Sequence, residues 1–142
     1  MKRLDVTAAV VIRGGRLFLA TRRNGSQYGG LWEFPGGKVE AGESLEECII
    51  RELKEELAWK VLSARECGVL SQERSGQSTL VLHFMRCVVA EDSQPVPQDG
   101  QQAQWFSSQE WDSLEMAPMD RLFLESHRSE LQEWLSDKAA QQ

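Results

Sequence analysis

GGKVEAGESLEECIIRELKEELAW, residues 36–59, is the stretch around which the rest of this chain is organised. It opens on a glycine pair, which allows the chain to turn sharply. Ser44 and Glu47 form the pattern of a capping box and predict a helix that begins at Leu45. At about 100° per residue, four apolar side chains share one stripe of this helix, namely Leu45, Ile49, Leu53 and Leu57.

Three glutamates lie together beside that stripe. Glu52, Glu55 and Glu56 are spaced i, i+3 and i+4, so the helix places them on one side. Carboxylates one turn apart repel each other by about 0.2–0.5 kcal/mol per pair. A hard divalent cation, which prefers oxygen ligands, would neutralise this repulsion. A solvated acidic face is the ordinary alternative, and the residues that flank the glutamates decide between the two.

Those flanking residues make the segment resemble the Nudix box, the signature of the Nudix hydrolases. The signature runs Gly, five residues, Glu, seven residues, Arg-Glu, an aliphatic residue, one residue, Glu-Glu, one residue, Gly and an aliphatic residue. The positions that match it are Gly37, Glu43, Arg51, Glu52, Leu53, Glu55 and Glu56. Ala58 and Trp59 depart from it at the end. Since glycine eases a left-handed helix end, this departure concerns the helix exit rather than the acidic cluster.

The remaining elements are predicted from apolar patterns and turn residues. Strands are expected at 4–12, 16–23, 59–70, 78–89 and 104–106, with a polar turn at 71–77 and a long loop at 90–103. Gly14-Gly15 fits a hairpin turn. On the return strand, alternation puts Leu17 and Leu19 on one face, and Phe18 and Ala20 on the other. A terminal helix is expected from Asp120, with these candidates for burial: Leu122, Phe123, Leu131, Trp134 and Leu135.

Composition narrows the class of protein. The chain of 142 residues is 41% hydrophobic and 27% charged, as expected of one soluble globular domain over residues 1–142. A net charge of -6 argues against a duplex nucleic-acid binder, which needs a basic face. Three cysteines without paired spacing indicate reduced thiols, and no apolar run suits a signal peptide or a membrane helix. We therefore expect a cytoplasmic protein without a membrane partner, as a monomer or weak dimer.

The resemblance extends to the MutT branch of the family over most of residues 4–125. It rests on the segments 21–23 (TRR), 31–40 (LWEFPGGKVE) and 116–120 (MAPMD), and on Trp105. It implies an α/β fold in the form of an α/β/α sandwich with a mixed β-sheet, which agrees with the predicted order of elements. It also implies cleavage of a nucleoside triphosphate into monophosphate and pyrophosphate with Mg²⁺, or possible use of Mn²⁺.

The same resemblance implies a role for each matching residue. The metal ligands would be Glu52, Glu55 and Glu56. Backbone carbonyls at Gly36 and Gly37 would be further ligands, because glycine has no Cβ atom to obstruct their approach to the metal. Arg51, with Glu43, would orient a metal-binding glutamate; simple pairing with Glu47 or Glu55 on the helix surface is the alternative. Lys38 would contact a phosphate, or else be a solvated lysine.

The general base has two candidates. In the MutT branch an acidic residue stands six positions before a tryptophan, and Asp99 stands six before Trp105. Asp99 would act as the base or as a further metal ligand. Its alternatives are an ordinary turn aspartate at that position and Glu52 as the base.

Base recognition would involve residues outside the helix. Asp120 occupies the place where the branch reads the base edge, although it could instead cap the terminal helix. Arg23 would contact the base or remain solvated, and Phe34 and Leu82 would wall the base pocket or belong to the core. The favoured substrate is 8-oxo-dGTP. CTP or a modified dCTP is the runner-up substrate. Two other functions remain as alternatives: a domain that binds a nucleotide without hydrolysing it, and an acidic protein-interaction module.

Overall fold

A computed structural model of the chain describes residues 2–76 and 78–137. Its strands are β1 (Lys2–Val10), β2 (Ile12–Arg13), β3 (Arg16–Thr21), β4 (Trp32–Glu33), β5 (Gly36–Lys38), β6 (Val61–Arg74), β7 (Ser78–Val89) and β8 (Ala103–Phe106). Its helices are α1 (Leu45–Leu57), the short 3-10 helix η1 (Ser108–Ser113), α2 (Pro118–Ser126) and α3 (Arg128–Ser136). Among these described residues, no helix has the length and apolar character needed to cross a membrane.

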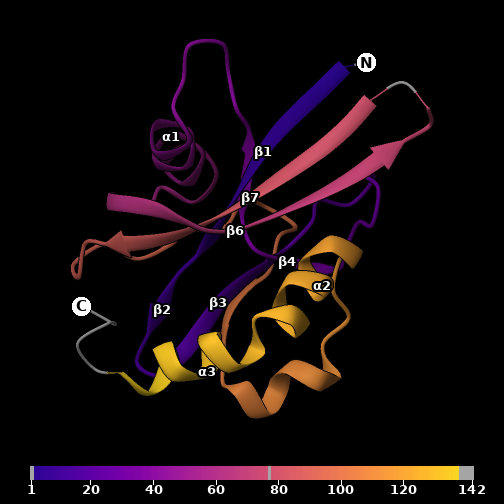
Figure 1. The fold of residues 1–142 in the computed structure, drawn as a ribbon. Helices are drawn as coiled ribbons and strands as arrows, with labels where there is room; N and C mark the ends of the chain where they lie inside the picture. The colour runs from indigo at the N-terminus through magenta and orange to yellow at the C-terminus, as the bar shows by residue number, and fades with distance from the viewer. Residues whose placement is uncertain (1, 77, 138–142) are drawn as a thin grey trace.

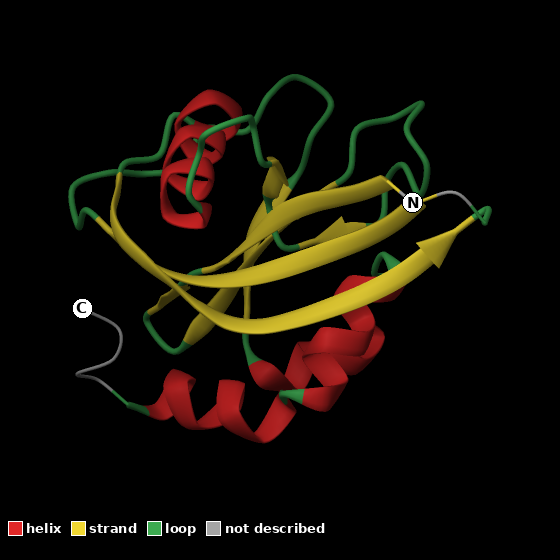
Figure 2. Cartoon of the chain, turned by 45° about the horizontal axis from the view of Figure 1, so that its top comes forward, coloured by secondary structure: helices red, strands yellow, loops and turns green. Residues whose placement is uncertain are grey.

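Two sheets lie between the helices (Figure 1). The first has the order β5-β1-β7-β6, in which β1 and β7 are parallel and the other pairs antiparallel. The second has the order β2-β3-β4, with β8 also paired to β3. Figure 2 shows α1 on one side of the strands, and α2 and α3 on the other. The predicted α/β/α sandwich with a mixed sheet is therefore confirmed.

The core has one half on each side of the strands. Leu17 and Leu19 of β3 pack in the half that contains Phe123 of α2. Phe18 and Ala20 of the same strand pack in the half that contains the apolar stripe of α1. The predicted alternation along β3 is correct, and because both of its faces are covered, the strand is apolar almost throughout. The Gly14-Gly15 turn is also confirmed, since both residues adopt positive φ between β2 and β3.

Helix α1 begins and ends through identifiable contacts. The Glu47 N–H donates to Ser44 Oγ at 3.0 Å, and the Ser44 N–H donates to Glu47 Oε1 at 2.8 Å, which confirms the predicted capping box. At the other end Ala58 adopts the left-handed conformation, with φ 51° and ψ 34°. Ala58 therefore makes the turn that the family's glycine would make, and it delivers Trp59 into the core, fully buried.

Two predictions about the second half of the chain are wrong. The polar turn expected at 71–77 is a strand as far as Arg74, because β6 continues to pair with β7 there. This part of β6 lies at the edge of its sheet with exposed side chains, so it carries no apolar alternation. Ser75 and Gly76 form a turn after β6, and residue 77 of the predicted turn lies outside the described residues.

The terminal helix also differs from its prediction. It begins at Pro118 rather than at Asp120, and it is interrupted at His127, so that two helices replace one. Asp120 is the third residue of α2, and Ala117 occupies the N-cap position. The buried face of α2 is Asp120, Phe123 and Leu124. Leu122, predicted to be buried, is 55% exposed because it points away from that face.

Candidate active site

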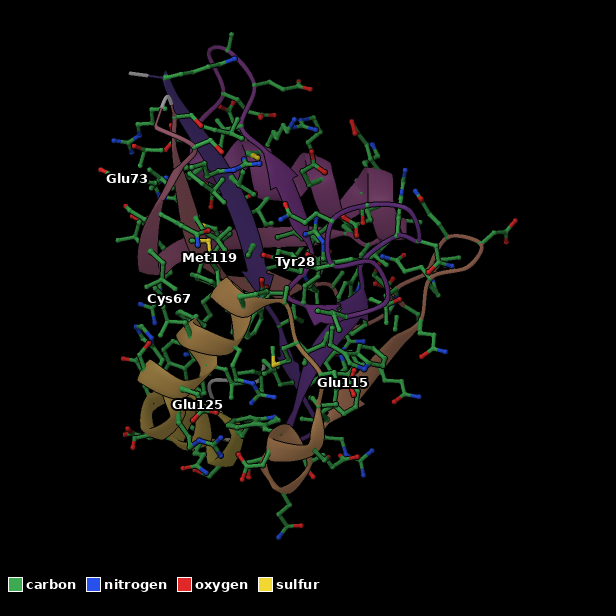
Figure 3. All side chains as sticks on the ribbon, turned by 90° about the vertical axis from the view of Figure 1, so that its right-hand side faces the viewer. Tyr28, Cys67, Glu73, Glu115, Met119 and Glu125 are labelled. Carbon is green, nitrogen blue, oxygen red and sulfur yellow. The ribbon has the colours of Figure 1, made fainter. Side chains whose placement is uncertain are left out.

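One cavity of about 1010 Å³ opens between the strands, the first turn of α2 and the loop that follows β3. One end, the acidic end, has Glu52, Glu55 and Glu56 beside Gly36 and Gly37. Lys38, which pairs with Val6 across β5 and β1, also lines the cavity. The other end includes Leu4, Val6, Phe34, Leu82, Met119 and Asp120. Arg22, Arg23 and Tyr28 come from the loop at its rim. Figure 3 views this side of the molecule, with Tyr28 and Met119 labelled.

The glycine pair allows β5 to pass between β1 and the acidic side of α1. A Cβ atom on Gly36 would collide with the backbone carbonyl of Thr7 on the neighbouring strand. A Cβ atom on Gly37 would collide with the carboxyl group of Glu52. The absence of both Cβ atoms therefore brings the Glu52 carboxylate directly onto the backbone of β5.

Arg51 holds the acidic end together. Its Nε and Nη2 donate to the two oxygens of Glu43 at 2.6 and 3.0 Å. Its Nη1 donates to Glu52 Oε1 at 2.8 Å, and its Nη2 to the Lys38 carbonyl at 3.0 Å. The contact with Glu55 is longer, at 3.4 Å. Hydrogen bonds from Arg51 lower the pKa of Glu43 to about 2, so Glu43 stays ionised and fixes the guanidinium.

Glu56 is held from the opposite side of the cavity by a residue that the sequence did not single out. Gln101, in the loop before β8, donates through Nε2 to Glu56 Oε1 at 3.1 Å and to the Thr21 carbonyl at 3.3 Å. Burial raises the pKa of Glu56 to about 7, with further contributions from the negative charges of Glu33 and Glu52. The sequence offered one indication that Gln101 could lie in the site, namely its position two residues after the predicted site residue Asp99.

The apolar end contains a second buried carboxyl group. Asp120 is 6% exposed, and its Oδ1 accepts the Phe34 N–H at 2.9 Å. Burial raises the pKa of Asp120 to about 7, although the Phe34 N–H acts in the opposite direction. Phe34 and Leu82 line the cavity and also belong to the core.

The rim adds an ion pair that sequence reasoning also missed. Arg22 Nη1 donates to Glu33 Oε1 at 2.7 Å. Burial, and next the charge of Asp120, raise the pKa of Glu33 to about 7. Arg23 lines the cavity and donates through Nη2 to Gln98 Oε1. Both residues lie in segments that carried the resemblance, 21–23 and 31–40, but no role had been predicted for either.

Asp99 is the one predicted metal ligand that the structure does not place in the cavity. It lies exposed in a turn that Gly100 completes with a φ of 80°, whereas its neighbours Gln98 and Gln101 line the cavity. Arg51 is also outside the lining, and it reaches the cavity through Glu52. The structure thus brings together the other predicted residues at the two ends of a single cavity.

Comparisons with known proteins agree with this geometry. Residues 1–127 match the family model described as the NUDIX domain. The chain belongs to the Nudix family. A CTP pyrophosphohydrolase of Escherichia coli K12 is 35% identical over 127 residues, which cover 89% of this chain and 92% of the relative. An 8-oxo-dGTP diphosphatase of Haemophilus influenzae is 31% identical over 134 residues, with 89% and 96% covered.

Solved structures of similar proteins have the same architecture. The solution structure of the E. coli ORF135 protein superposes with a TM-score of 0.76 at 34% identity and covers 91% of each chain. A MutT structure, from work on the enzymes of Aliivibrio salmonicida and Vibrio cholerae, also gives 0.76, at 28% identity, over 91% of this chain and 99% of that one. The resemblance predicted from residues 36–59 is confirmed.

The donor set of this Nudix domain suits a divalent cation. Three carboxylates line one end of the cavity, and carboxylate oxygens are the ligands that Mg²⁺ and Mn²⁺ prefer. They face different partners, because Glu52 and Glu55 contact Arg51 while Glu56 contacts Gln101. Within residues 2–76 and 78–137, no three side-chain ligands already form a cluster ready to hold a metal ion. A bound cation would therefore turn these carboxylates toward itself and relieve their repulsion.

Proposed function

We propose that this Nudix domain is a Mg²⁺-dependent nucleoside triphosphate pyrophosphohydrolase that releases a nucleoside monophosphate and pyrophosphate. The observation that carries the proposal is the joining of two unlike ends in one cavity. Its acidic end has three carboxylates that would bind a cation, and its apolar end presents the buried carboxyl group of Asp120 among apolar side chains. A triphosphate and its base would each find matching chemistry there.

The cation would be held by Glu52, Glu55 and Glu56, with carbonyl oxygens of Gly36 and Gly37 as further donors; Mn²⁺ is the other candidate ion. When bound, it would neutralise phosphate charge and orient or acidify the attacking water. The protein's own contribution is positional. Arg51 fixes Glu52 from one side, and Gln101 fixes Glu56 from the other. Lys38, which is exposed and lines the cavity, would contact a phosphate oxygen.

Of the two candidate bases, the geometry favours Glu52. Glu52 lies in the cavity, and Asp99 lies in an exposed turn outside it. We expect Asp99→Asn to keep kcat within about threefold of the wild type, because loss of a general base costs about 10²–10⁴-fold. Steady-state pyrophosphate release, with Glu52→Gln as the comparison, measures this. A decrease of about 100-fold in the kcat of Asp99→Asn would instead indicate that Asp99 is the general base.

We propose 8-oxo-dGTP as the preferred substrate, whose removal would keep the oxidised base out of DNA. Support comes from the relatives named 8-oxo-dGTP diphosphatase and from the second oxygen of Asp120. The Phe34 N–H is donated to Oδ1, and the second oxygen of the carboxylate would accept the N1–H and N2–H₂ of a guanine.

CTP or a modified dCTP is the second candidate. Asp120 also suits cytosine, because a carboxylate accepts the cytosine amino group, and a relative at 35% identity is named CTP pyrophosphohydrolase. A panel of 8-oxo-dGTP, dGTP, CTP and 5-methyl-dCTP separates the two through kcat/KM for pyrophosphate release. The highest kcat/KM for 8-oxo-dGTP is the expected result. A kcat/KM for CTP well above that for 8-oxo-dGTP would instead make CTP the preferred substrate.

A further inference from the structure

The rim of the cavity carries an exposed aromatic ring that neither metal binding nor base-edge recognition uses. Six large hydrophobic side chains stand exposed among the described residues, and of these only Tyr28 lines the cavity. Tyr28 is 46% exposed and is the single tyrosine of the chain. An exposed ring at the mouth of a ligand cavity keeps an apolar face free for a ligand with a flat apolar face.

The backbone holds this ring in place at an unfavourable conformation. Tyr28 has a φ of 62°, in the left-handed region that aromatic residues seldom adopt. Surrounding hydrogen bonds impose it: the Leu31 N–H donates to the Tyr28 carbonyl at 3.1 Å, and the Gly29 N–H to the Ser26 carbonyl at 3.0 Å. Arg22 Nε donates to the Gln27 carbonyl at 2.7 Å. Such strain persists only where the surroundings determine it, and it often marks a functional position.

Met119, in the first turn of α2, also lines this cavity, which opens between α2 and the loop that carries Tyr28. The loop of Tyr28 leads into β4, and β4 is tied to the segment before α2. The Trp32 N–H donates to the Glu115 carbonyl at 2.9 Å, and the Ala117 N–H to the Trp32 carbonyl at 3.0 Å. Figure 3 shows Tyr28 and Met119 on these neighbouring elements. Backbone hydrogen bonds therefore hold the segment after the Tyr28 loop against the segment before α2, and so fix the positions of these two walls of the cavity relative to each other.

Tyr28 and Met119 differ in chemistry from Asp120, which lines the same cavity. Asp120 presents charge or a hydrogen-bonding group, which reads the edge of a base. Tyr28 presents a π-face and Met119 a polarisable thioether, both of which pack on the flat face of a ring. Face contacts are tolerant of base identity because every nucleobase has a π-face.

We infer that Tyr28 and Met119 form a clamp that stacks on the two faces of the substrate's nucleobase. The inference rests on the proposed function and adds a division of labour to it. The clamp selects for triphosphates that carry an aromatic base, and Asp120 discriminates between bases.

Kinetics of matched variants test the clamp. Tyr28→Asn removes the ring but tolerates the left-handed backbone, whereas Tyr28→Phe keeps the ring. We expect Tyr28→Asn to raise KM about tenfold or more for every nucleotide, with kcat/KM ratios between bases unchanged. Tyr28→Phe should match the wild type, and Met119→Ala should give a smaller rise than Tyr28→Asn. An unchanged KM in Tyr28→Asn, or an altered base preference, would overturn the clamp.

A spectroscopic test does not depend on turnover. Because Tyr28 is the single tyrosine, 3-fluorotyrosine labelling gives one ¹⁹F reporter at the proposed contact. The α,β-methylene analogues of dGTP and CTP should both shift its resonance in the presence of Mg²⁺, and inorganic tripolyphosphate should not. An equal shift with tripolyphosphate, or no shift with either nucleotide analogue, would contradict the clamp. Failure of the proposed function would appear separately, as an absence of pyrophosphate release from the wild type.

Discussion

Ala58 shows how one residue can depart from a family signature without changing the geometry that the signature encodes. A left-handed conformation costs a residue with a Cβ atom about 1–2 kcal/mol relative to the right-handed one, and glycine avoids that cost. Ala58 nevertheless adopts it, because its N–H donates to the Lys54 carbonyl at 3.0 Å and the next residue, Trp59, is fully buried. Burial of Trp59 supplies the compensation.

Ala58→Gly should therefore stabilise the protein. We expect an increase of about 0.5–1 kcal/mol in the free energy of unfolding, because the relief of strain exceeds the extra entropy of glycine in the unfolded chain. Denaturant titration measures it. Lys54→Gly, in the same helix but with helical backbone angles, is the matched control and should lose about 1 kcal/mol. A destabilised Ala58→Gly would mean that Ala58 is not strained.

The pair of Glu43 and Arg51 makes a second residue-scale prediction, which concerns pH. The pKa of Glu43 falls from 4.5 to about 2 in the folded protein, so the pair contributes stability that is present above about pH 5 and is lost as pH falls toward 2. Glu43→Gln should remove that contribution. The difference in unfolding free energy between wild type and variant should be larger at pH 6 than at pH 3. A difference that is the same at both pH values would show that Glu43 is not ionised through this contact.

At the scale of elements, sequence reasoning succeeded where local chemistry specifies the answer. Helix α1 carries its own cap, stripe and acidic side, so its start and its chemistry follow from local spacing. β6 and the terminal helices do not specify themselves in this way. The outer part of β6 is polar because it lies at the edge of the sheet. Leu122 is exposed and Leu124 is buried, although both are leucines in the same helix. Only tertiary packing distinguishes those cases.

The contact between β6 and α2 provides an element-scale prediction. Phe123 stacks on Phe84 at 3.8 Å between ring centroids and on His127 at 4.2 Å. β6 passes this stack at Gly68, where its register shifts, and a Cβ atom there would lie 2.7 Å from the Phe123 ring and 3.2 Å from His127. Gly68→Ala should destabilise the protein by about 1–3 kcal/mol, because the buried ring must move. Thermal or denaturant unfolding measures the change, and wild-type stability in this variant would contradict the packing described here.

For the whole molecule, the functional residues come from several distant parts of the chain. The Nudix box predicted the acidic end of the cavity from one continuous stretch, because one helix and one glycine pair build it. Gln101 and Glu33 could not be predicted in this way, since each depends on how loops from separate strands meet across the cavity. Asp99 shows what spacing along the chain leaves open. Its distance of six positions from Trp105 predicted a place in the site, and in the structure it is exposed in the turn at Gly100, outside the cavity lining.

The joining of an acidic end to an apolar end in one cavity is the property from which the proposed activity follows, and a variant of Glu55 tests it most directly. Glu55 lines the cavity and is exposed, so Glu55→Gln removes a proposed cation ligand with little effect on packing. Glu91→Gln, an exposed glutamate outside the cavity lining, is the control for the loss of one charge.

The measurement is pyrophosphate release from 8-oxo-dGTP and from CTP as a function of Mg²⁺ concentration. Wild type and Glu91→Gln should show Mg²⁺-dependent turnover, and Glu55→Gln should lose about two orders of magnitude or more in kcat/KM. Mg²⁺-independent turnover, or a Glu55→Gln variant as active as the wild type, would contradict the assignment of this cavity as a metal-dependent hydrolytic site.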